Sequence, residues 1–181
     1  GRALVYLGSA SGLATSAAWT AESNQAFGWF GVSAASAGDV NGDGYGDVIV
    51  GDPRYKNGVN EVGRARVYLG ASTGVATSPA WSLEGGQVGG GFARSVGTAG
   101  DVNGDGLADI LVGAPDETFG QAHEGTVHVF LGTAAGTAIE SGSITLLEGN
   151  QANSYFGDPG TTAGDVNGDG FSDVIVGAVG Y

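Results

Sequence analysis

"AGDVNGDGYGDVIVG" occupies residues 37–51, and two further stretches repeat it: "AGDVNGDGLADILVG" at 99–113 and "AGDVNGDGFSDVIVG" at 163–177. In each copy Asp, Asn, Asp and Asp stand at positions 1, 3, 5 and 9 of a nine-residue loop, directly before a run of β-branched or aliphatic residues. Glycine stands at position 6, where it allows the sharp turn that brings alternate side chains round one point. The sequence therefore predicts three oxygen-rich loops, each leading into a strand.

The side chains of these loops suit a hard divalent cation. Three ionised carboxylates this close repel one another, and Ca²⁺ removes the repulsion while taking about 6–8 oxygen ligands. Mg²⁺ prefers a tighter octahedron and is the second choice, and Zn²⁺ is disfavoured because the loops lack His and Cys. The alternative is a polar turn without a metal, which a threefold repetition makes the weaker interpretation.

We therefore predict three Ca²⁺ sites per chain, with side-chain ligands at positions 1, 3, 5 and 9 and a backbone carbonyl at position 7. The predicted ligands are Asp39, Asn41, Asp43, Tyr45 and Asp47 in the first loop, Asp101, Asn103, Asp105, Leu107 and Asp109 in the second, and Asp165, Asn167, Asp169, Phe171 and Asp173 in the third.

The composition limits the classes of function. The chain has 181 residues and a net charge of −13, from 19 acidic and 6 basic residues, and nine of its twelve aspartates lie in the three loops. Nucleic acid is an unsuitable partner because phosphate contacts need Lys and Arg. No apolar run is long enough to cross a bilayer, so we expect no membrane insertion. Cysteine is absent, which excludes disulfides and thiolate metal sites.

The whole chain is built from one repeating unit. "GRALVYLG" at residue 1 returns as "GRARVYLG" at 63 and "GTVHVFLG" at 125, which gives repeats 1–62, 63–124 and 125–181 of a single segment, 1–181. Four short strand-like runs fill the first unit, at 3–8, 17–22, 29–36 and 47–51. Gly-rich connections separate them, and no segment has a helical period. We predict an all-β fold made of four-stranded antiparallel propeller blades.

Short motifs on either side of each loop resemble a known family. "FG" stands at 30–31 and 156–157, with Phe-Ala at 92–93, and "GAP" stands at 113–115, with Gly-Asp-Pro at 51–53 and Gly-Ala-Val at 177–179. The unit resembles the FG-GAP repeat of integrin α-subunit β-propellers and of related bacterial extracellular proteins. This resemblance implies calcium in the hairpin loop between the first and second strands of a blade. The third unit departs from the pattern with "FGDPG", which places Pro159 in a strand.

The phase of the repeat predicts how the chain assembles. In family order the FG strand and the strand after the loop are the first two of a blade, so we expect two complete blades, 27–84 and 92–148, and a complementary half-blade at each end. Three blades are too few for a ring, since propellers have about 4–8. We predict that two chains close head to tail as a six-bladed homodimer. A nine-bladed trimer and a piece of a longer, typically seven-bladed propeller are the alternatives.

The resemblance implies a non-enzymatic scaffold for extracellular or cell-surface recognition and adhesion. A lectin-like propeller and a structural or engineered assembly without a ligand are the alternatives. Trp29 occurs in the first unit alone and is the predicted contact residue; a single patch around it or around 54–56 would favour a protein ligand, and identical pockets at each blade junction would favour a glycan. Trp19 and Trp81 are predicted to pack between blades, and His128 to lie at the surface.

Overall fold

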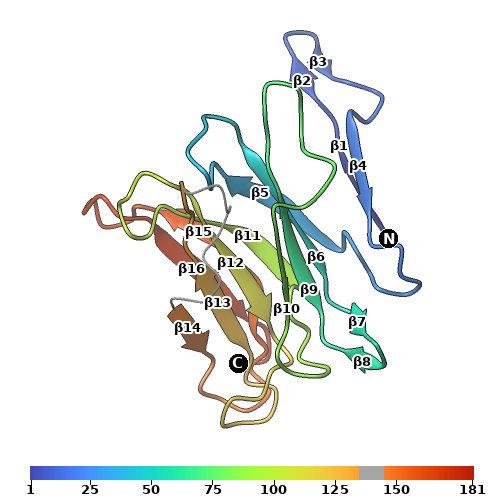
Figure 1. The fold of residues 1–181 in the computed structure, drawn as a ribbon. Coiled ribbons are helices and arrows are strands. Elements are labelled where there is room, and N and C mark those ends of the chain that lie inside the picture. The colour runs from blue at the N-terminus through green and yellow to red at the C-terminus, as the bar shows by residue number, and fades with distance from the viewer. Residues whose placement is uncertain (135–144) are drawn as a thin grey trace.

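The computed structural model describes residues 1–134 and 145–181, and it contains strands and turns but no helix within those ranges (Figure 1). The strands are β1 (Arg2–Val5), β2 (Gly8–Ser9), β3 (Gly12–Leu13), β4 (Trp19–Glu22), β5 (Ser33–Gly38), β6 (Asp47–Asp52), β7 (Lys56–Asn57), β8 (Asn60–Glu61), β9 (Arg64–Tyr68), β10 (Trp81–Glu84), β11 (Ser95–Gly100), β12 (Asp109–Ala114), β13 (Thr126–Phe130), β14 (Thr145–Glu148), β15 (Phe156–Gly164) and β16 (Asp173–Ala178). The all-β prediction is confirmed.

The strands form two complete sheets and two half-sheets. One four-stranded antiparallel sheet has the order β5-β6-β9-β10, and the next has the order β11-β12-β13-β14. The pair β1-β4 lies at one end of the array and the pair β15-β16 at the other (Figure 1). The remaining pairs, β2-β3 and β7-β8, are two-residue ribbons in the connections. The array has the arrangement expected of two blades and two half-blades, and one chain does not close a ring.

The first strands of successive blades lie side by side. The strand β11 packs against both β5 and β15. Serine side chains link these neighbours: the amide of Val96 donates to Ser33 Oγ at 2.9 Å, and the amide of Gly160 donates to Ser95 Oγ at 3.0 Å. Since these serines occupy equivalent positions in two repeats, the same contact is used at two successive junctions.

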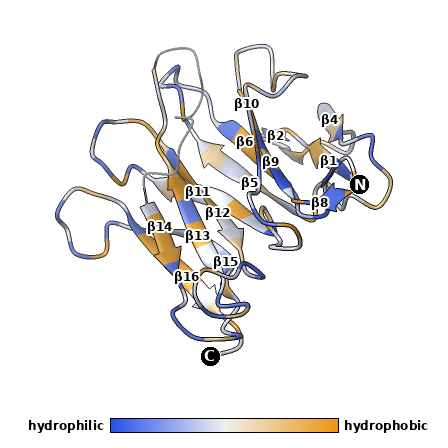
Figure 2. Cartoon of the chain, turned by 60° about the horizontal axis from the view of Figure 1, so that its bottom comes forward, coloured by the Kyte–Doolittle hydropathy of each residue, from blue (hydrophilic) through white to orange (hydrophobic). Residues whose placement is uncertain are grey.

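The core lies between the sheets. Each of the second strands β6 and β12 is covered on both faces, and Ile49, Val50, Ile110 and Leu111 are fully buried. Figure 2 shows hydrophobic residues, in orange, along many of the strands, β14 and β16 among them. This burial explains why the second strand of each unit is apolar on both sides of the pleat.

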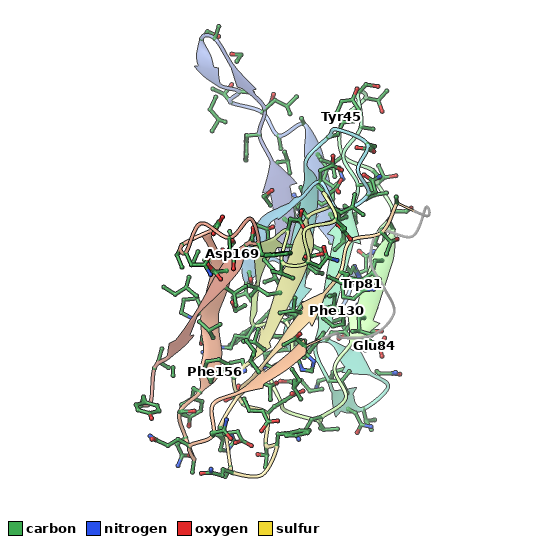
Figure 3. All side chains as sticks on the ribbon, turned by 90° about the vertical axis from the view of Figure 1, so that its left-hand side faces the viewer. Tyr45, Trp81, Glu84, Phe130, Phe156 and Asp169 are labelled. Atoms are coloured by element: carbon green, nitrogen blue, oxygen red, sulfur yellow. The ribbon has the colours of Figure 1, made fainter. Side chains whose placement is uncertain are left out.

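Aromatic pairs hold neighbouring blades together. Trp19 meets Tyr68 edge to face with ring centroids 4.9 Å apart. Trp81 meets Phe130 in the same way at 5.3 Å (Figure 3). Trp19 Nε1 also donates to the carbonyl of Ala76 at 2.8 Å. The prediction that these tryptophans pack between blades is confirmed.

Two local features differ from the simple repeat. The prediction of a surface position for His128 is wrong: its side chain is about one-fifth exposed, packs edge to face on Phe92, and lies 3.3 Å from Glu117 Oε2. Pro159 lies in β15 where the register shifts between Phe156 and Gly160, on a strand whose other edge is free of ladder bonds within the described residues. No helix in the described ranges is long and apolar enough to span a membrane.

Candidate metal-binding loops and the pocket at the opposite end

Each Asp-rich loop joins the first and second strands of a blade, as the family resemblance implied. The loops follow β5, β11 and β15 and lead into β6, β12 and β16. A register shift ends each first strand, so the chain leaves the ladder at the residue before the first Asp. The glycines at position 6, Gly44, Gly106 and Gly170, have φ of +87°, +88° and +93°. This left-handed conformation explains the need for glycine there.

The first carboxylate of each loop is held by backbone amides. Asp39 Oδ1 accepts hydrogen bonds from the amides of Gly42 and Asp43 at 2.8 and 3.1 Å, and Asp39 Oδ2 accepts from Gly44 at 2.7 Å. Asp101 and Asp165 accept the equivalent bonds within 0.2 Å of these lengths. The loop therefore wraps round its first side chain in all three copies.

The Asn at position 3 and the Asp at position 5 are hydrogen-bonded to each other. In the first loop Asn41 Nδ2 donates to Asp43 Oδ2 at 3.0 Å, and Asp43 Oδ1 accepts from the amide of Tyr45 at 2.9 Å. The second and third loops repeat both bonds. The side chain at position 7 plays no part in these bonds, which is consistent with its variation among Tyr, Leu and Phe.

The carboxylate at position 9 connects the loop to the third strand of its own blade. Asp47 Oδ2 accepts from the amide of Val40, and Asp47 Oδ1 accepts from the amide of Gly70 at 2.7 Å. Asp109 makes the same two bonds, the second of them with Gly132 at 2.9 Å. Within the described residues Asp173 makes only the first of these two bonds, because its sheet there consists of β15 and β16 and has no third strand.

The loops carry negative charge without a basic partner. Within residues 1–134 and 145–181, none of the nine loop carboxylates forms an ion pair with Lys, Arg or His. Burial raises the pKa of Asp47 and of Asp109, and the neighbouring carboxylates add to that rise. In the exposed third loop, hydrogen bonds from backbone amides, that of Gly170 foremost, lower the pKa of Asp165.

The donor set fits Ca²⁺ in chemistry, while the side chains are arranged as a hydrogen-bonded turn. Each loop offers carboxylate oxygens and one side-chain amide oxygen, which are the ligands of a hard cation. In the described ranges, however, no three Asp, Glu or His side chains converge as a ready-made metal centre. An ionised carboxylate has about four acceptor sites, so the carboxylates at positions 1, 5 and 9 can accept the amide bonds and still offer lone pairs to a cation. The predicted ligand sets therefore remain a prediction.

A pocket of about 550 Å³ lies at the opposite end of the first strands. Trp29 lines it from the segment before β5, half exposed, with the guanidinium of Arg54 4.7 Å from the indole centroid. Arg54 is paired with Glu61 at 3.0 Å. Arg94, from the segment before β11, is paired with Asp158 of β15 at 3.0 Å. The pocket lining thus includes an aromatic ring and two partly exposed ion pairs.

The pocket is not repeated from blade to blade. Its residues occupy positions that are equivalent in the repeats yet chemically different: Trp29, Gly91 and Tyr155 at one position, Val32, Arg94 and Asp158 at a second, and Arg54, Asp116 and Gly180 at a third. Most of these residues line the pocket or a smaller cavity beside it. The loops at the other end repeat nearly unchanged, so the repeats diverge where they meet in one pocket.

Comparison with known proteins settles the family. A model of the FG-GAP repeat matches residues 30–68, 92–130 and 159–181, more than half of the chain. The chain belongs to the FG-GAP repeat family. The third match begins at Pro159, after the "FG" of that FG-GAP unit, where the strand register shifts.

The chain spans less than a fifth of the length of the curated relatives that follow. Integrin alpha-5 of Xenopus laevis is 36% identical over 161 residues, which covers 84% of this chain and 15% of the relative. Integrin alpha-PS2 of Drosophila melanogaster is 38% identical over 148 residues, 78% of this chain and 10% of the relative. Phosphatidylinositol-glycan-specific phospholipase D of Mus musculus is 33% identical over 158 residues, 82% of this chain and 18% of the relative.

Sequence reasoning missed several buried polar positions, Asp52 and Glu117 among them. Asp52, at the position that is Ala114 in the next repeat, is fully buried. Glu117, also buried, accepts a hydrogen bond from the Thr126 hydroxyl. The only signal was the departure of "GDP" at 51–53 from "GAP", which marks Asp52 as an irregular residue without showing where it points.

Proposed function

We propose that this FG-GAP segment is a calcium-stabilised, non-enzymatic scaffold that presents a recognition surface outside the cell. The observation that carries the proposal is the contrast between the two ends of the first strands. At one end the repeats keep the same carboxylate loop three times, and at the other they diverge into a single pocket. A repeated end suits a structural role, and a divergent end suits selective contact.

In the proposed sites, carboxylate and amide oxygens at positions 1, 3, 5 and 9 and the carbonyl at position 7 hold one Ca²⁺ in each loop. The ion supplies positive charge to three carboxylates that have no basic partner among the described residues. The loop's own amides already bend it round the first Asp, so the chain needs no large backbone change to offer these oxygens. Proton competition at Asp47 and Asp109 begins at a higher pH than at an ordinary Asp, because burial raises the pKa of both.

Thermal unfolding in calcium and in chelator tests the structural role. With dissociation constants near 10⁻⁴ M, each site adds about 1.4 kcal/mol at roughly 1 mM Ca²⁺. Three sites together should raise Tm by on the order of 10 °C. Asp43→Asn should reduce the calcium-dependent rise by about a third, and Glu148→Gln, outside the loops, should leave it intact. Identical melting curves in calcium and chelator would refute the calcium role.

Protein recognition is the first candidate for the pocket. The divergence of equivalent positions supports it, since a repeated glycan site would place the same aromatic residue in every blade. Aromatic and Arg side chains are also enriched where protein interfaces bind most strongly. Arg54 and Arg94 meet this description, and both are about half exposed on their side chains.

Glycan binding is the second candidate, because the exposed indole of Trp29 lies beside polar Arg and carboxylate groups. A glycan array and a panel of immobilised extracellular-matrix proteins distinguish the two. Trp29→Ala should remove the signal on the array or panel that responds, and Phe27→Ala, a neighbour 87% exposed, should not. Binding that survives Trp29→Ala would refute the assignment of the pocket.

We also propose that the segment lacks enzymatic activity. Its repeated carboxylates suit ligation, and two relatives, phospholipases D by name, each match over only 18% of their length. The purified chain should not hydrolyse a phosphatidylinositol-glycan substrate. Turnover that is abolished by Trp29→Ala or Asp158→Asn would contradict this part of the proposal.

A further inference from the structure

Among the described residues, the strands β1 and β16 at the two ends of the array each have an edge without a ladder partner, and the two edges are complementary. In the complete blades the second strand pairs with the third, as β6 pairs with β9 and β12 with β13. The second strand β16 ends the array on one side, and the third strand β1 ends it on the other. Unpaired strand edges bind other strands. We propose that two copies of the polypeptide 1–181 bind each other through these edges, β16 of each copy pairing with β1 of the other, to close a six-bladed ring.

The repeats specify the register of this pairing. In the complete blades Val48 lies opposite Tyr68, and Ile110 lies opposite Phe130. The equivalent residues are Val174 in β16 and Tyr6 just after β1. The predicted partners across the new ladder are therefore Val174 with Tyr6, Ile175 with Val5, Val176 with Leu4, Gly177 with Ala3, and Ala178 with Arg2.

Side chains at both edges are exposed where their equivalents are buried. Ile175 is 60% exposed, and its equivalents Ile49 and Leu111 are fully buried. Tyr6 is 42% exposed, whereas its equivalents Tyr68 and Phe130 are at most 2% exposed. The half-sheets thus have the apolar side chains of a blade core without the strands that cover them. Each half-sheet presents the strands that the other lacks.

A third observation comes from the last Asp-rich loop. Asp47 and Asp109 each accept a hydrogen bond from a glycine amide that follows the third strand of their blade, Gly70 or Gly132. Asp173 lacks this donor within the described residues, and the equivalent glycine is Gly8, after β1. The proposed ring places Gly8 of the second copy at Asp173 and completes the third loop.

The space round Gly8 fits the same conclusion. A side chain on Gly70 would lie 2.3 Å from the carbonyl oxygen of Gly46, and one on Gly132 would lie 2.5 Å from that of Ala108. A side chain on Gly8 would meet no atom within 4 Å in the single chain. In the proposed ring it would meet the carbonyl of Ser172, the equivalent of Ala108, in the second copy.

Closure by two copies is the arrangement that the geometry favours. Within one chain β1 and β16 lie at opposite ends of the array (Figure 1), and pairing them would make a ring of three blades. Two copies give six blades, within the range of about 4–8 seen in propellers. Head-to-tail contacts either close into a ring or continue as an open filament, so the particle mass decides between them.

Gly8→Val is the decisive variant because the single chain has room for it. The unmodified chain should have twice the 17.8 kDa mass of one copy by light scattering. Gly8→Val should reduce the mass to one copy with unchanged circular dichroism. Gly86→Val is the matched control, since Gly86 is also exposed with no atom within 4 Å of an added side chain, and it should remain dimeric.

Cysteine cross-linking tests the register. The chain has no cysteine, so Leu4→Cys together with Val176→Cys introduces the only two thiols. Oxidation should give a covalent dimer on a non-reducing gel, and Leu4→Cys with Ile175→Cys, one residue out of register on the opposite face, should cross-link at least tenfold less.

Four other outcomes would overturn the proposal. A mass of one copy, a nine-bladed trimer or open polymers would each refute the two-copy ring, and so would a dimer that Gly8→Val leaves intact. The measurements are made in calcium and in chelator. A dimer that persists in chelator with no calcium-dependent rise in Tm would refute the calcium role while supporting the ring.

Discussion

Asp52 is a position at which a single substitution should stabilise this protein. It ends β6, where the next repeats have Ala114 and Ala178, and it is fully buried beneath the backbone of Gly28. Neither carboxylate oxygen has a hydrogen-bond partner in the described part of the chain. Burial raises the pKa of Asp52 to about 6, against smaller opposing effects from the nearby Ser23 hydroxyl and Arg66 guanidinium.

The magnitude follows from linkage between proton binding and folding. A folded pKa near 6 against an ordinary 3.8 corresponds to about 3 kcal/mol, since one pKa unit is worth about 1.4 kcal/mol. Because the pKa of an acid is raised, the contribution to stability is fully present below about pH 4. It is lost as pH rises through 6, when the folded state has to hold a buried charge.

Asp52→Ala should therefore raise the free energy of unfolding at pH 7.5 by about 2–3 kcal/mol and Tm by roughly 5–10 °C. The gain should shrink towards zero near pH 4. Asp52→Asn, which keeps the shape and removes the charge, should share the pH dependence. Urea unfolding at pH 4.5, 6 and 7.5 measures all three proteins. If both variants are less stable than the unmodified chain at pH 7.5, the carboxylate is a stabilising partner of Arg66 and the reasoning is wrong.

Two other substitutions test the packing and the buried polar cluster. Trp19→Ala should lower the free energy of unfolding in urea by about 3–5 kcal/mol, because it removes the edge-to-face contact with Tyr68. Trp29→Ala, at a half-exposed residue, should lower it by under about 1 kcal/mol. Equal losses in the two variants would contradict the packing described. Burial alone would raise the pKa of Glu117, but hydrogen bonds with His128 and Thr126 outweigh burial and lower the pKa. The ionised Glu117 therefore stabilises the fold above the ordinary pKa of 4.5, and this stabilisation is lost as pH falls through the pKa of the folded state. Glu117→Gln should cost about 1–2 kcal/mol at pH 6.5 and less at pH 3.5, and a cost that grows on acidification would refute this assignment.

The sequence predicts the blades well because the repeat supplies its own internal comparison. Strand β12 could be recognised from "DILVG", since a run apolar on both faces must be covered on both faces. The half-blades followed from the order of motifs along the chain. The ribbons β2-β3 and β7-β8 could not be predicted, because two-residue ladders depend on how a connection folds back.

In the candidate site, too, some features could be predicted from the sequence and others could not. The turn at Gly44 could be predicted, because position 6 has to adopt a left-handed conformation. The donor of Asp47 Oδ1 could not, because Gly70 is 23 residues away and reaches the loop only when the third strand is in place. The pocket was equally hidden: Trp29, Arg54 and Arg94 come from separate connections, and only the side-by-side first strands bring them together.

Calorimetric titration of metal-free protein with CaCl₂ tests whether each of the three loops binds a divalent cation. We expect three Ca²⁺ ions bound per chain at pH 7.5, and two in Asp43→Asn. No uptake of Ca²⁺ up to about 10 mM, beyond the weakest affinities of extracellular calcium modules, would contradict this expectation.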